Sequence, residues 1–202
     1  MLDNAKARRS LARLIDPIAK FMIRLKVTPD GITWFGCAAT VVVSVAFLAQ
    51  GSFLVGGILF GLFALIDLLD GTMARMLGTA GPWGAFLDST LDRISDAAVI
   101  CALIYLYGNH EHEFAQLAVV AGIVSLVMSL MTSYARAKAE SLNASATVGI
   151  AERAERNLII WLALMISALT VDVMPFALVL LAGLASITVI QRIIFVRKQL
   201  VS

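Results

Sequence analysis

Four aspartates in one stretch of the chain have the types and spacing that could do chemistry. The stretch from Asp67 to Asp92 reads DLLDGTMARMLGTAGPWGAFLDSTLD, and its acids are Asp67, Asp70, Asp88 and Asp92. The sequence around them is strongly apolar, and one charged side chain near the centre of a bilayer costs about 2.5–3.5 kcal/mol on insertion scales. Four acids in such a neighbourhood would be unfavourable alone, so we expect cations to bind them.

The spacing of the aspartates predicts two pairs, each on one face of a helix. Asp67 and Asp70 are three residues apart, and Asp88 and Asp92 are four apart. Both separations bring side chains onto the same helical face. Two facing helices can then surround one small volume with carboxylates. Carboxylate oxygens suit Mg²⁺, Mn²⁺ or Ca²⁺, two such ions would balance the charge, and a two-metal centre suits displacement at phosphorus.

The composition indicates an integral membrane protein. Hydrophobic residues make up 60% of the 202 residues, and the mean hydropathy is +0.89, which excludes an ordinary soluble domain. The net charge of +2 is close to neutral, and we expect no nucleic acid as a partner. Two cysteines, Cys37 and Cys101, lie in apolar segments and are expected to be buried free thiols.

Apolar segments of roughly membrane-spanning length follow one another along the chain with short gaps. We therefore expect an all-α integral membrane protein that forms a single domain over residues 1–202, with a core of six transmembrane helices in residues 31–202. The expected spans are residues 31–50, 53–76, 84–108, 114–136, 157–171 and 174–196. Residues 1–30 interleave basic and apolar residues at helical spacing, which predicts an N-terminal amphipathic surface helix and not a signal peptide.

The distribution of charge predicts which side of the membrane the acids face. With six spans, both termini share one side with the loops near residues 78 and 144, where the Lys and Arg residues gather. The positive-inside rule puts this side, with the acids, in the cytoplasm of a multi-pass cell-membrane protein. The opposite loop GNHEHEF contains His110 and His112, and we expect it to be solvated instead of forming a metal site.

A second group of charged residues lies between the fourth and fifth expected helices. It comprises Arg136, Lys138, Arg153 and Arg156, and Arg192 in the last helix falls on the same side of the membrane. Arg and Lys side chains beside a two-metal centre suggest a second, phosphate-bearing substrate. The alternative is that these cations only anchor the protein at the membrane surface.

The aspartate stretch resembles the signature of the CDP-alcohol phosphotransferase family, D-x2-D-G-x2-A-R-x8-G-x3-D-x3-D. Every fixed position and every spacing agree, at Asp67, Asp70, Gly71, Ala74, Arg75, Gly84, Asp88 and Asp92. The resemblance implies an enzyme that transfers a phosphatidyl or similar group from a CDP-linked donor to an alcohol and releases CMP. It also implies six membrane helices, two divalent ions (Mg²⁺ or Mn²⁺) at the signature acids, and a homodimer.

Two shorter elements resemble one branch of this family. The ER-x-E-R element from Glu152 to Arg156 and the D-R-I-S-D run from Asp92 to Asp96 are similar to those of actinobacterial phosphatidylinositol-phosphate synthases. This implies phospholipid biosynthesis from CDP-diacylglycerol and inositol phosphate. The alternative within the family is a phosphatidylglycerophosphate synthase that uses glycerol 3-phosphate. A metal-ion transporter is the alternative that is not an enzyme. An ion path, however, does not need the glycines, alanine and arginine that accompany the acids, at positions 71, 74, 75 and 84.

The residue pattern and the resemblance together suggest a role for each candidate residue. The metal ligands are expected to be Asp67, Asp70, Asp88 and Asp92, and Asp92 is also the expected catalytic base. The expected donor-binding residues are Pro29, Asp30, Gly71, Ala74, Arg75, Gly81 and Gly84. The expected acceptor-binding residues are Arg136, Lys138, Arg153, Arg156 and Arg192. For Arg75, snorkelling or pairing with a neighbouring acid stays an alternative to contact with a substrate phosphate.

Overall fold

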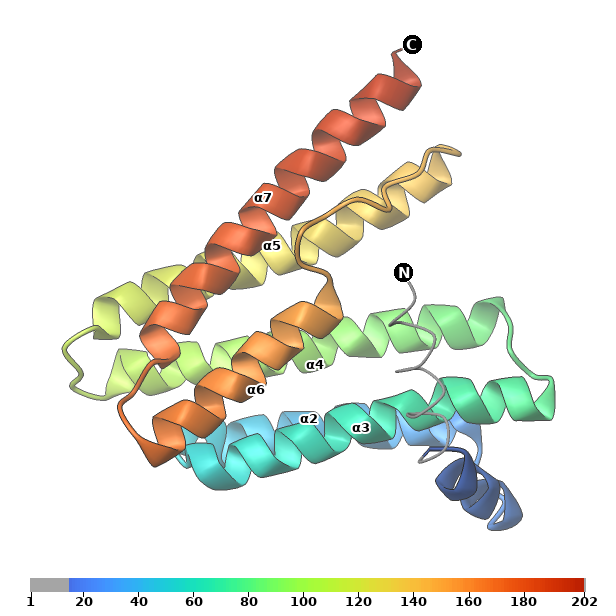
Figure 1. Ribbon diagram of the computed structural model, residues 1–202, viewed down its shortest axis with the longest axis horizontal. Helices are drawn as coiled ribbons and strands as arrows, with labels where there is room; N and C mark the ends of the chain where they lie inside the picture. Colours follow the sequence, from blue (N-terminus) through green and yellow to red (C-terminus); the bar gives the residue numbers. More distant parts are fainter. Residues whose placement is uncertain (1–14, 202) are drawn as a thin grey trace, which may run out of the picture. The chain divides into compact units, whose positions relative to one another are not determined.

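The computed structural model describes residues 15–201, and this part of the chain is helical with no strand. Residues 15–24 form a helix, and residues 1–14 lie outside the described part of the chain. The elements that follow are α2 (Pro29–Ala46), the short 3-10 helix η1 (Leu48–Gln50), α3 (Phe53–Leu77), α4 (Pro82–Asn109), α5 (Ala115–Ser141), α6 (Arg153–Leu169) and α7 (Met174–Leu200) (Figure 1). The all-α prediction and its six long helices are confirmed, with ends that differ from the expected spans by a few residues.

Four stretches are long and apolar enough to cross a membrane. They are residues 29–50, which combine α2 with η1, and the helices α3, α5 and α7. Helix α4 does not meet this criterion because its first half carries Asp88, Asp92, Arg93 and Asp96, and α6 has only 17 residues. Several long apolar helices are consistent with an integral membrane protein, and two of the charges of α4, Asp88 and Asp92, belong to the stretch that is expected to do chemistry.

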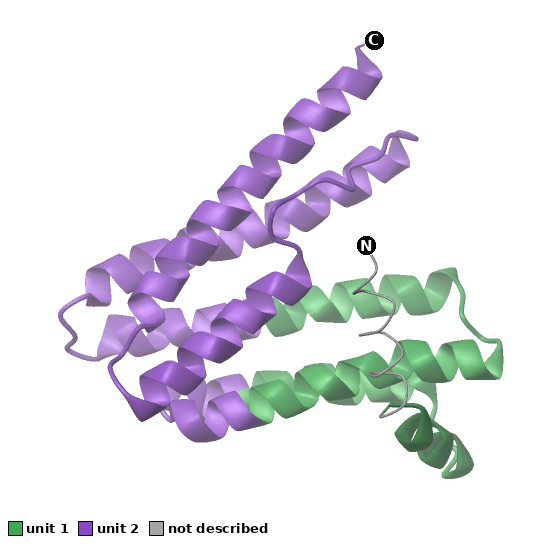
Figure 2. Ribbon diagram, viewed as in Figure 1, with its two compact units in different colours: residues 1–43, 59–96 green, residues 44–58, 97–202 purple. Residues whose placement is uncertain are grey.

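Two compact units make up the chain (Figure 2). Unit 1 comprises residues 1–43 and 59–96, and unit 2 comprises residues 44–58 and 97–202. The signature aspartates all lie in unit 1, whereas the expected acceptor-binding cations all lie in unit 2. The expectation of a single membrane domain stays a prediction.

The helix of residues 15–24 packs one face into unit 1 and exposes another. Ala19 is fully buried against Ile32 of α2 and against Leu69 and Met73 of α3. On the outer side lie the exposed apolar side chains of Ile18 and Phe21, together with the exposed cations Lys20 and Arg24. Exposed apolar and basic side chains on one short helix suit a membrane surface, as expected for this part of the N-terminal segment.

Helix α2 joins the two helices of unit 1 that carry the aspartates. It contacts α3 through the Ile32 cluster described above, and it contacts α4 where Cys37 packs with Leu87 and Leu91. The buried positions 32, 33, 36, 37 and 40 of α2 recur at helical spacing, so one continuous face of the helix makes these contacts. Cys37 is a buried free thiol as expected, whereas Cys101 is free but exposed on α4, which corrects that part of the prediction.

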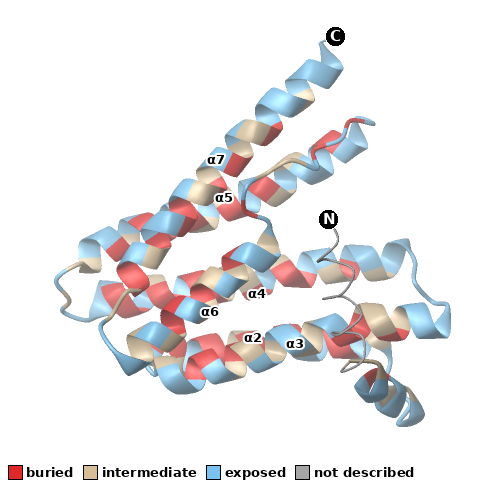
Figure 3. Cartoon of the chain, in the orientation of Figure 1, coloured by how far each residue is buried: buried red, intermediate tan, exposed pale blue. Residues whose placement is uncertain are grey.

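Unit 2 is built on α5, which packs along α7, and on α6, which also contacts α7. Buried and exposed positions alternate along α5 and α7 (Figure 3). Small residues let the helices of this unit approach closely. A Cβ atom at Gly122 of α5 would lie 2.6 Å from Ile104 of α4, and one at Gly57 of α3 would lie 3.2 Å from Leu164 of α6.

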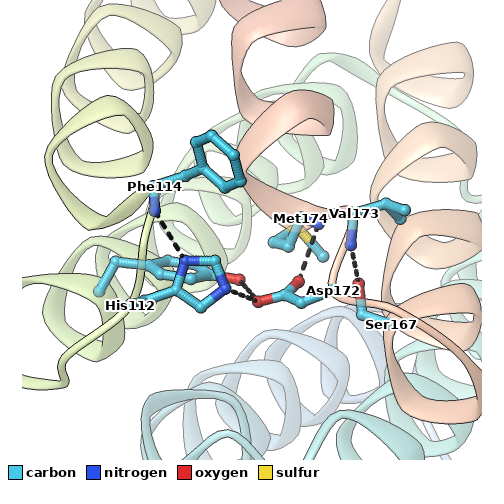
Figure 4. A network of polar contacts seen from close by, with 7 residues as sticks. His112, Phe114, Ser167, Asp172, Val173 and Met174 are labelled. Carbon is cyan, nitrogen blue, oxygen red and sulfur yellow. Dashed lines mark hydrogen bonds and ion pairs between the residues drawn. The ribbon is translucent and has the colours of Figure 1, made fainter.

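Asp172, in the turn between α6 and α7, is the centre of a polar network in unit 2 (Figure 4). Its Oδ1 accepts the backbone N–H of Met174 at 2.9 Å, and its Oδ2 accepts the hydroxyl of Tyr107. Nε2 of His112 lies 3.3 Å from the same Oδ2. Because Nδ1 of His112 accepts the backbone N–H of Phe114 at 3.1 Å, the ring has a proton on Nε2, the nitrogen that lies beside the carboxylate.

The expectation of a solvated GNHEHEF loop is therefore wrong for His112. Its side chain is partly buried and ties the α4–α5 loop to the α6–α7 turn. Sequence spacing does not indicate this contact, because Asp172 comes much later in the chain. Among the described residues, the group with metal-ligand geometry includes neither His110 nor His112, and the expectation that this loop is no metal site stays a prediction.

We expect Asp172→Ala to destabilise the protein, because it leaves the Tyr107 hydroxyl and the Met174 N–H without their acceptor. A lost acceptor of this kind costs about 1–3 kcal/mol, and each kcal/mol lowers the melting temperature by roughly 2–4 °C in a chain of this size. Thermal unfolding in detergent, followed by circular dichroism, measures the effect. Glu111→Ala changes an exposed acid of the α4–α5 loop and is the matched control. Equal melting temperatures for Asp172→Ala and the unmodified protein would contradict the role of the network.

Candidate active site

A short connection in unit 1 places the two pairs of aspartates on consecutive helices. Helix α3 ends where the N–H of Thr79 bonds the carbonyl of Ala74 at 2.9 Å, with Gly78 at φ +67°. This is the left-handed termination that glycine allows without strain. Pro82 then starts α4, at a position that needs no backbone donor. The chain thus turns back within a few residues, and the C-terminal half of α3 and the N-terminal half of α4 both contribute acids.

Three of the four aspartates meet. Asp67, Asp70 and Asp88 each offer one carboxylate oxygen, and these oxygens lie within 4.8 Å of one another. Asp70 is buried, with 8% of its surface exposed, and the other two are half-buried. Carboxylates this close repel each other, and the repulsion is strong where water is scarce. A divalent cation between them removes it, and an all-oxygen donor set fits Mg²⁺, Mn²⁺ or Ca²⁺.

Asp92 is not a member of this group of oxygens. It lies one helical turn beyond Asp88 on α4 and is itself buried. Its Oδ2 is 3.7 Å from Nη2 of Arg93. The structure therefore brings together three of the expected ligands and leaves the fourth a turn away, so the roles of Asp92 as metal ligand and base stay predictions.

Two hydrogen bonds orient the carboxylate of Asp70. The hydroxyl of Thr33 in α2 donates to Oδ2 at 2.7 Å, and the backbone N–H of Gly71 donates to Oδ1 at 2.5 Å. Thr33 is not among the residues expected from the sequence. The one signal in the sequence is that Thr33 places a hydroxyl on the otherwise mostly apolar face of α2. Its contact with Asp70, which is far away along the chain, is visible only in the structure.

The expected donor-binding residues all lie in unit 1, and one of them, Asp30, contacts Trp83. Asp30, in the first turn of α2, accepts a hydrogen bond from Nε1 of Trp83 at 2.9 Å, and Trp83 stands in the first turn of α4. A Cβ atom at Gly84 would meet nothing within 4 Å, so this face of α4 is open. The sequence alone did not indicate Trp83, because a tryptophan near a helix start is equally typical of a membrane interface.

Arg75 lies over Gly71 on α3. A Cβ atom at Gly71 would be 3.3 Å from Nη1 of Arg75, and Nη2 of Arg75 donates to the hydroxyl of Thr72 at 3.1 Å. Arg75 is exposed, so its guanidinium retains donors for a ligand. The remaining expected donor residues, Pro29, Ala74 and Gly81, belong to these same helix ends and to the α3–α4 connection.

The expected acceptor-binding cations of unit 2 have different environments. Arg192 of α7 is 4% exposed and donates from Nε to the carbonyl of Val148 at 3.0 Å and from Nη1 to that of Thr132 at 2.6 Å. Arg156 is 5% exposed, and its Nη1 lies 3.4 Å from the carbonyl of Ala151. Both guanidiniums therefore bind backbone of the α5–α6 loop, which the sequence did not indicate.

The other three cations of this set are more accessible. Arg153 is half-buried at the first position of α6. Arg136 is exposed and pairs with Glu140 through Nε and Oε1 at 2.9 Å, and Lys138 is exposed in the last turn of α5. Of the expected acceptor-binding cations, one is thus half-buried and two are exposed, besides the two that hold the loop.

Comparisons with known proteins identify the family of this chain. The CDP-alcohol phosphatidyltransferase family matches residues 26–196. The phosphatidylinositol phosphate synthase of Cutibacterium acnes is 40% identical over 207 residues, which cover 98% of each chain. The crystal structure of Mycobacterium tuberculosis phosphatidylinositol phosphate synthase with CDP-DAG bound is 35% identical, with a TM-score of 0.86 over 92% of this chain and 94% of that one.

A second crystal structure of the Mycobacterium tuberculosis protein is in complex with manganese and citrate. It is 35% identical, with a TM-score of 0.84 over 89% of this chain and 87% of that one. The family match contains the whole signature stretch and every expected acceptor-binding residue. With its acid cluster, its helices and its near full-length relatives, this chain belongs to the CDP-alcohol phosphatidyltransferase family of enzymes.

Proposed function

We propose that this protein transfers the phosphatidyl group of CDP-diacylglycerol to inositol phosphate, giving phosphatidylinositol phosphate and CMP. The observation that carries the proposal is the group formed by Asp67, Asp70 and Asp88, in a chain similar over nearly its whole length to phosphatidylinositol phosphate synthases. The donor has a pyrophosphate, which the metal centre of unit 1 would bind. The acceptor has a phosphate, which the cations of unit 2 would bind.

The metal centre is assigned to Asp67, Asp70 and Asp88, with Asp92 as the fourth ligand, and Mg²⁺ or Mn²⁺ as the ion. Two divalent ions bound there would offset the charge of the pyrophosphate and stabilise CMP as it leaves. The close approach of the three carboxylate oxygens supports this assignment. So does the complex of a relative with manganese.

The donor is proposed to bind beside α3 and α4, where glycines leave room. The open face at Gly84 and the exposed guanidinium of Arg75 over Gly71 provide space and a cation for the diphosphate. Pro29 and Asp30 border the same nucleotide site from α2, and the acyl chains stay in lipid. The relative that binds CDP-DAG supports this choice of donor.

The transfer is proposed to be a direct displacement without a covalent enzyme intermediate. The acceptor hydroxyl attacks the β-phosphorus, a new phosphorus–oxygen bond forms, and the bond from this phosphorus to the oxygen of CMP breaks. Asp92 takes the proton of the hydroxyl, as a carboxylate within hydrogen-bond reach can do. The acceptor's phosphate is bound by Arg153, Arg156 and Arg192, with Lys138 and Arg136 behind them.

We further propose that all six long helices cross the membrane, α4 and α6 included, and that the acid cluster faces the cytoplasm. The second half of α4, residues 97–109, has no charged side chain, and α6 is at the short end of the spanning range. The Lys and Arg residues in the last turns of α5 and the first turn of α6 support the orientation. A homodimer, as implied by the family resemblance, completes this arrangement.

We expect Asp70→Asn to abolish transfer, because the amide has the same shape but lacks the charge that binds the ion. Activity should fall by more than roughly 100-fold, since loss of even an outer-shell partner of a metal costs 10–100-fold. CMP release from CDP-diacylglycerol and inositol phosphate measures it, with purified protein in detergent. Circular dichroism verifies the fold, and full activity in a folded Asp70→Asn protein would refute the metal assignment.

We expect Gly71→Leu to raise the KM for CDP-diacylglycerol, because the new side chain displaces the guanidinium of Arg75 and fills space for the diphosphate. Overpacking of this kind costs about 1–3 kcal/mol, which corresponds to roughly tenfold or more. Initial rates at varied donor concentration give the KM. Gly183→Leu, on α7 at a glycine whose Cβ would meet nothing within 4 Å, is the control. An unchanged donor KM would move the donor site away from Gly71.

We expect Arg153→Ala to weaken binding of inositol phosphate while the donor is much less affected. A charged contact is worth about 1.5–3 kcal/mol, so the acceptor KM should rise roughly tenfold or more. Arg197→Ala, which removes an exposed cation of α7, is the matched control. Glycerol 3-phosphate is tested in the same assay. Equal rates with both acceptors, unchanged in Arg153→Ala, would indicate that these cations serve only as membrane anchors.

A further inference from the structure

We infer that Thr33 is a positioning residue for the metal centre: its hydroxyl holds the carboxylate of Asp70 in the orientation that receives the ion. The inference rests on the proposed function, because it assumes that Asp70 is a metal ligand. Thr33 lies outside the family signature described above, and it comes from a different helix, α2. It would act through Asp70 and has no proposed contact with substrate.

The hydroxyl of Thr33 has one proton and two possible acceptors. Oδ2 of Asp70 lies at 2.7 Å, and the carbonyl of Pro29 lies at 3.1 Å. The shorter contact goes to a charged oxygen, and hydrogen bonds to ionised acceptors are about twice as strong as neutral ones. Thr33 is 7% exposed and Asp70 is 8% exposed, so water is a poor substitute for this donor. The proton therefore belongs to the bond with Asp70.

This bond determines the plane of the Asp70 carboxylate before any ion binds. Oδ2 receives the Thr33 hydroxyl and Oδ1 receives the N–H of Gly71, so rotation of the carboxylate would break both bonds. Each carboxylate oxygen has two acceptor positions, so one stays available on each oxygen for a cation. A ligand that is already oriented loses less freedom when the ion binds, which is why outer-shell donors strengthen metal sites.

The first turn of α2 contacts both α3 and α4, and these contacts fix the position of the Thr33 backbone. Ile32, next to Thr33, is buried against Leu69 and Met73 of α3. In the same first turn of α2, Asp30 accepts the indole N–H of Trp83 from α4. The turn that carries Thr33 is therefore tied to both helices whose aspartates form the cluster, and its backbone cannot move away from Asp70 without breaking these contacts.

The test is Mn²⁺ binding to the purified full chain without either substrate, measured from the electron paramagnetic resonance signal of free Mn²⁺. Thr33→Val keeps the shape of the side chain and removes the hydroxyl, and we expect the Mn²⁺ dissociation constant to rise roughly tenfold or more. Thr33→Ser retains the donor and should bind within about twofold to threefold of the unmodified protein. Thr188→Val removes a buried hydroxyl that donates to the carbonyl of Leu184 in its own helix, and this matched control should bind Mn²⁺ normally.

Thr33→Ala removes the hydroxyl with less bulk, and it replaces the valine variant if that protein fails to fold by circular dichroism. Mn²⁺ affinity of the folded Thr33→Val or Thr33→Ala protein equal to that of the unmodified chain would overturn the role of Thr33 alone. A Thr33→Ser protein as weak as Thr33→Val would also overturn it, because the hydroxyl would then not be the cause. Absence of Mn²⁺ binding by the unmodified chain would instead refute the metal centre, and with it the basis of this inference.

Discussion

The structure of unit 1 depends on one constraint: carboxylates that repel each other are held close together in a mostly apolar chain. Asp67, Asp70 and Asp88 meet within 4.8 Å, although charged groups of like sign disfavour such proximity where water is scarce. The left-handed Gly78 and the short α3–α4 connection make the encounter possible. Thr33 and the N–H of Gly71 then provide donors for the most buried acid, Asp70. The turn brings the acids together and the donors orient one of them, and a cation site needs both.

Among the described residues of unit 2, the buried charged side chains are two arginines, so they need acceptors instead of a cation. Arg156 and Arg192 are almost fully buried, and each donates to backbone carbonyls of loop or helix. A buried guanidinium is unfavourable unless its donors are used. These contacts hold the α5–α6 loop, which leads to Arg153 at the start of α6. A substitution of Arg192 would therefore disturb both the loop and any phosphate, which is why Arg153 is the cleaner probe of the acceptor.

Much of the fold could be predicted because membrane helices are strongly patterned. Long apolar runs separated by Pro, Gly and charged residues predicted every long helix, and the three- and four-residue spacings predicted which acids share a face. The first half of α4 carries more charged residues than an ordinary span, and the signature predicted a use for two of them, Asp88 and Asp92. Helix ends were less certain, as for α5, which continues to Ser141 beyond the apolar run because its last turns are polar but still good helix formers.

The amino-acid sequence by itself determined the helices, the family and the candidate acids, since these depend on local periodicity and on a motif with fixed spacing. Only the tertiary structure decided which polar groups meet across long stretches of chain. The bond from Thr33 to Asp70, the bond from Trp83 to Asp30, and the contact of His112 with Asp172 each join different helices or loops. It also decided that Asp92 stands outside the group of three oxygens. Such pairings depend on how helices pack and rotate against one another, and sequence spacing contains no measure of either.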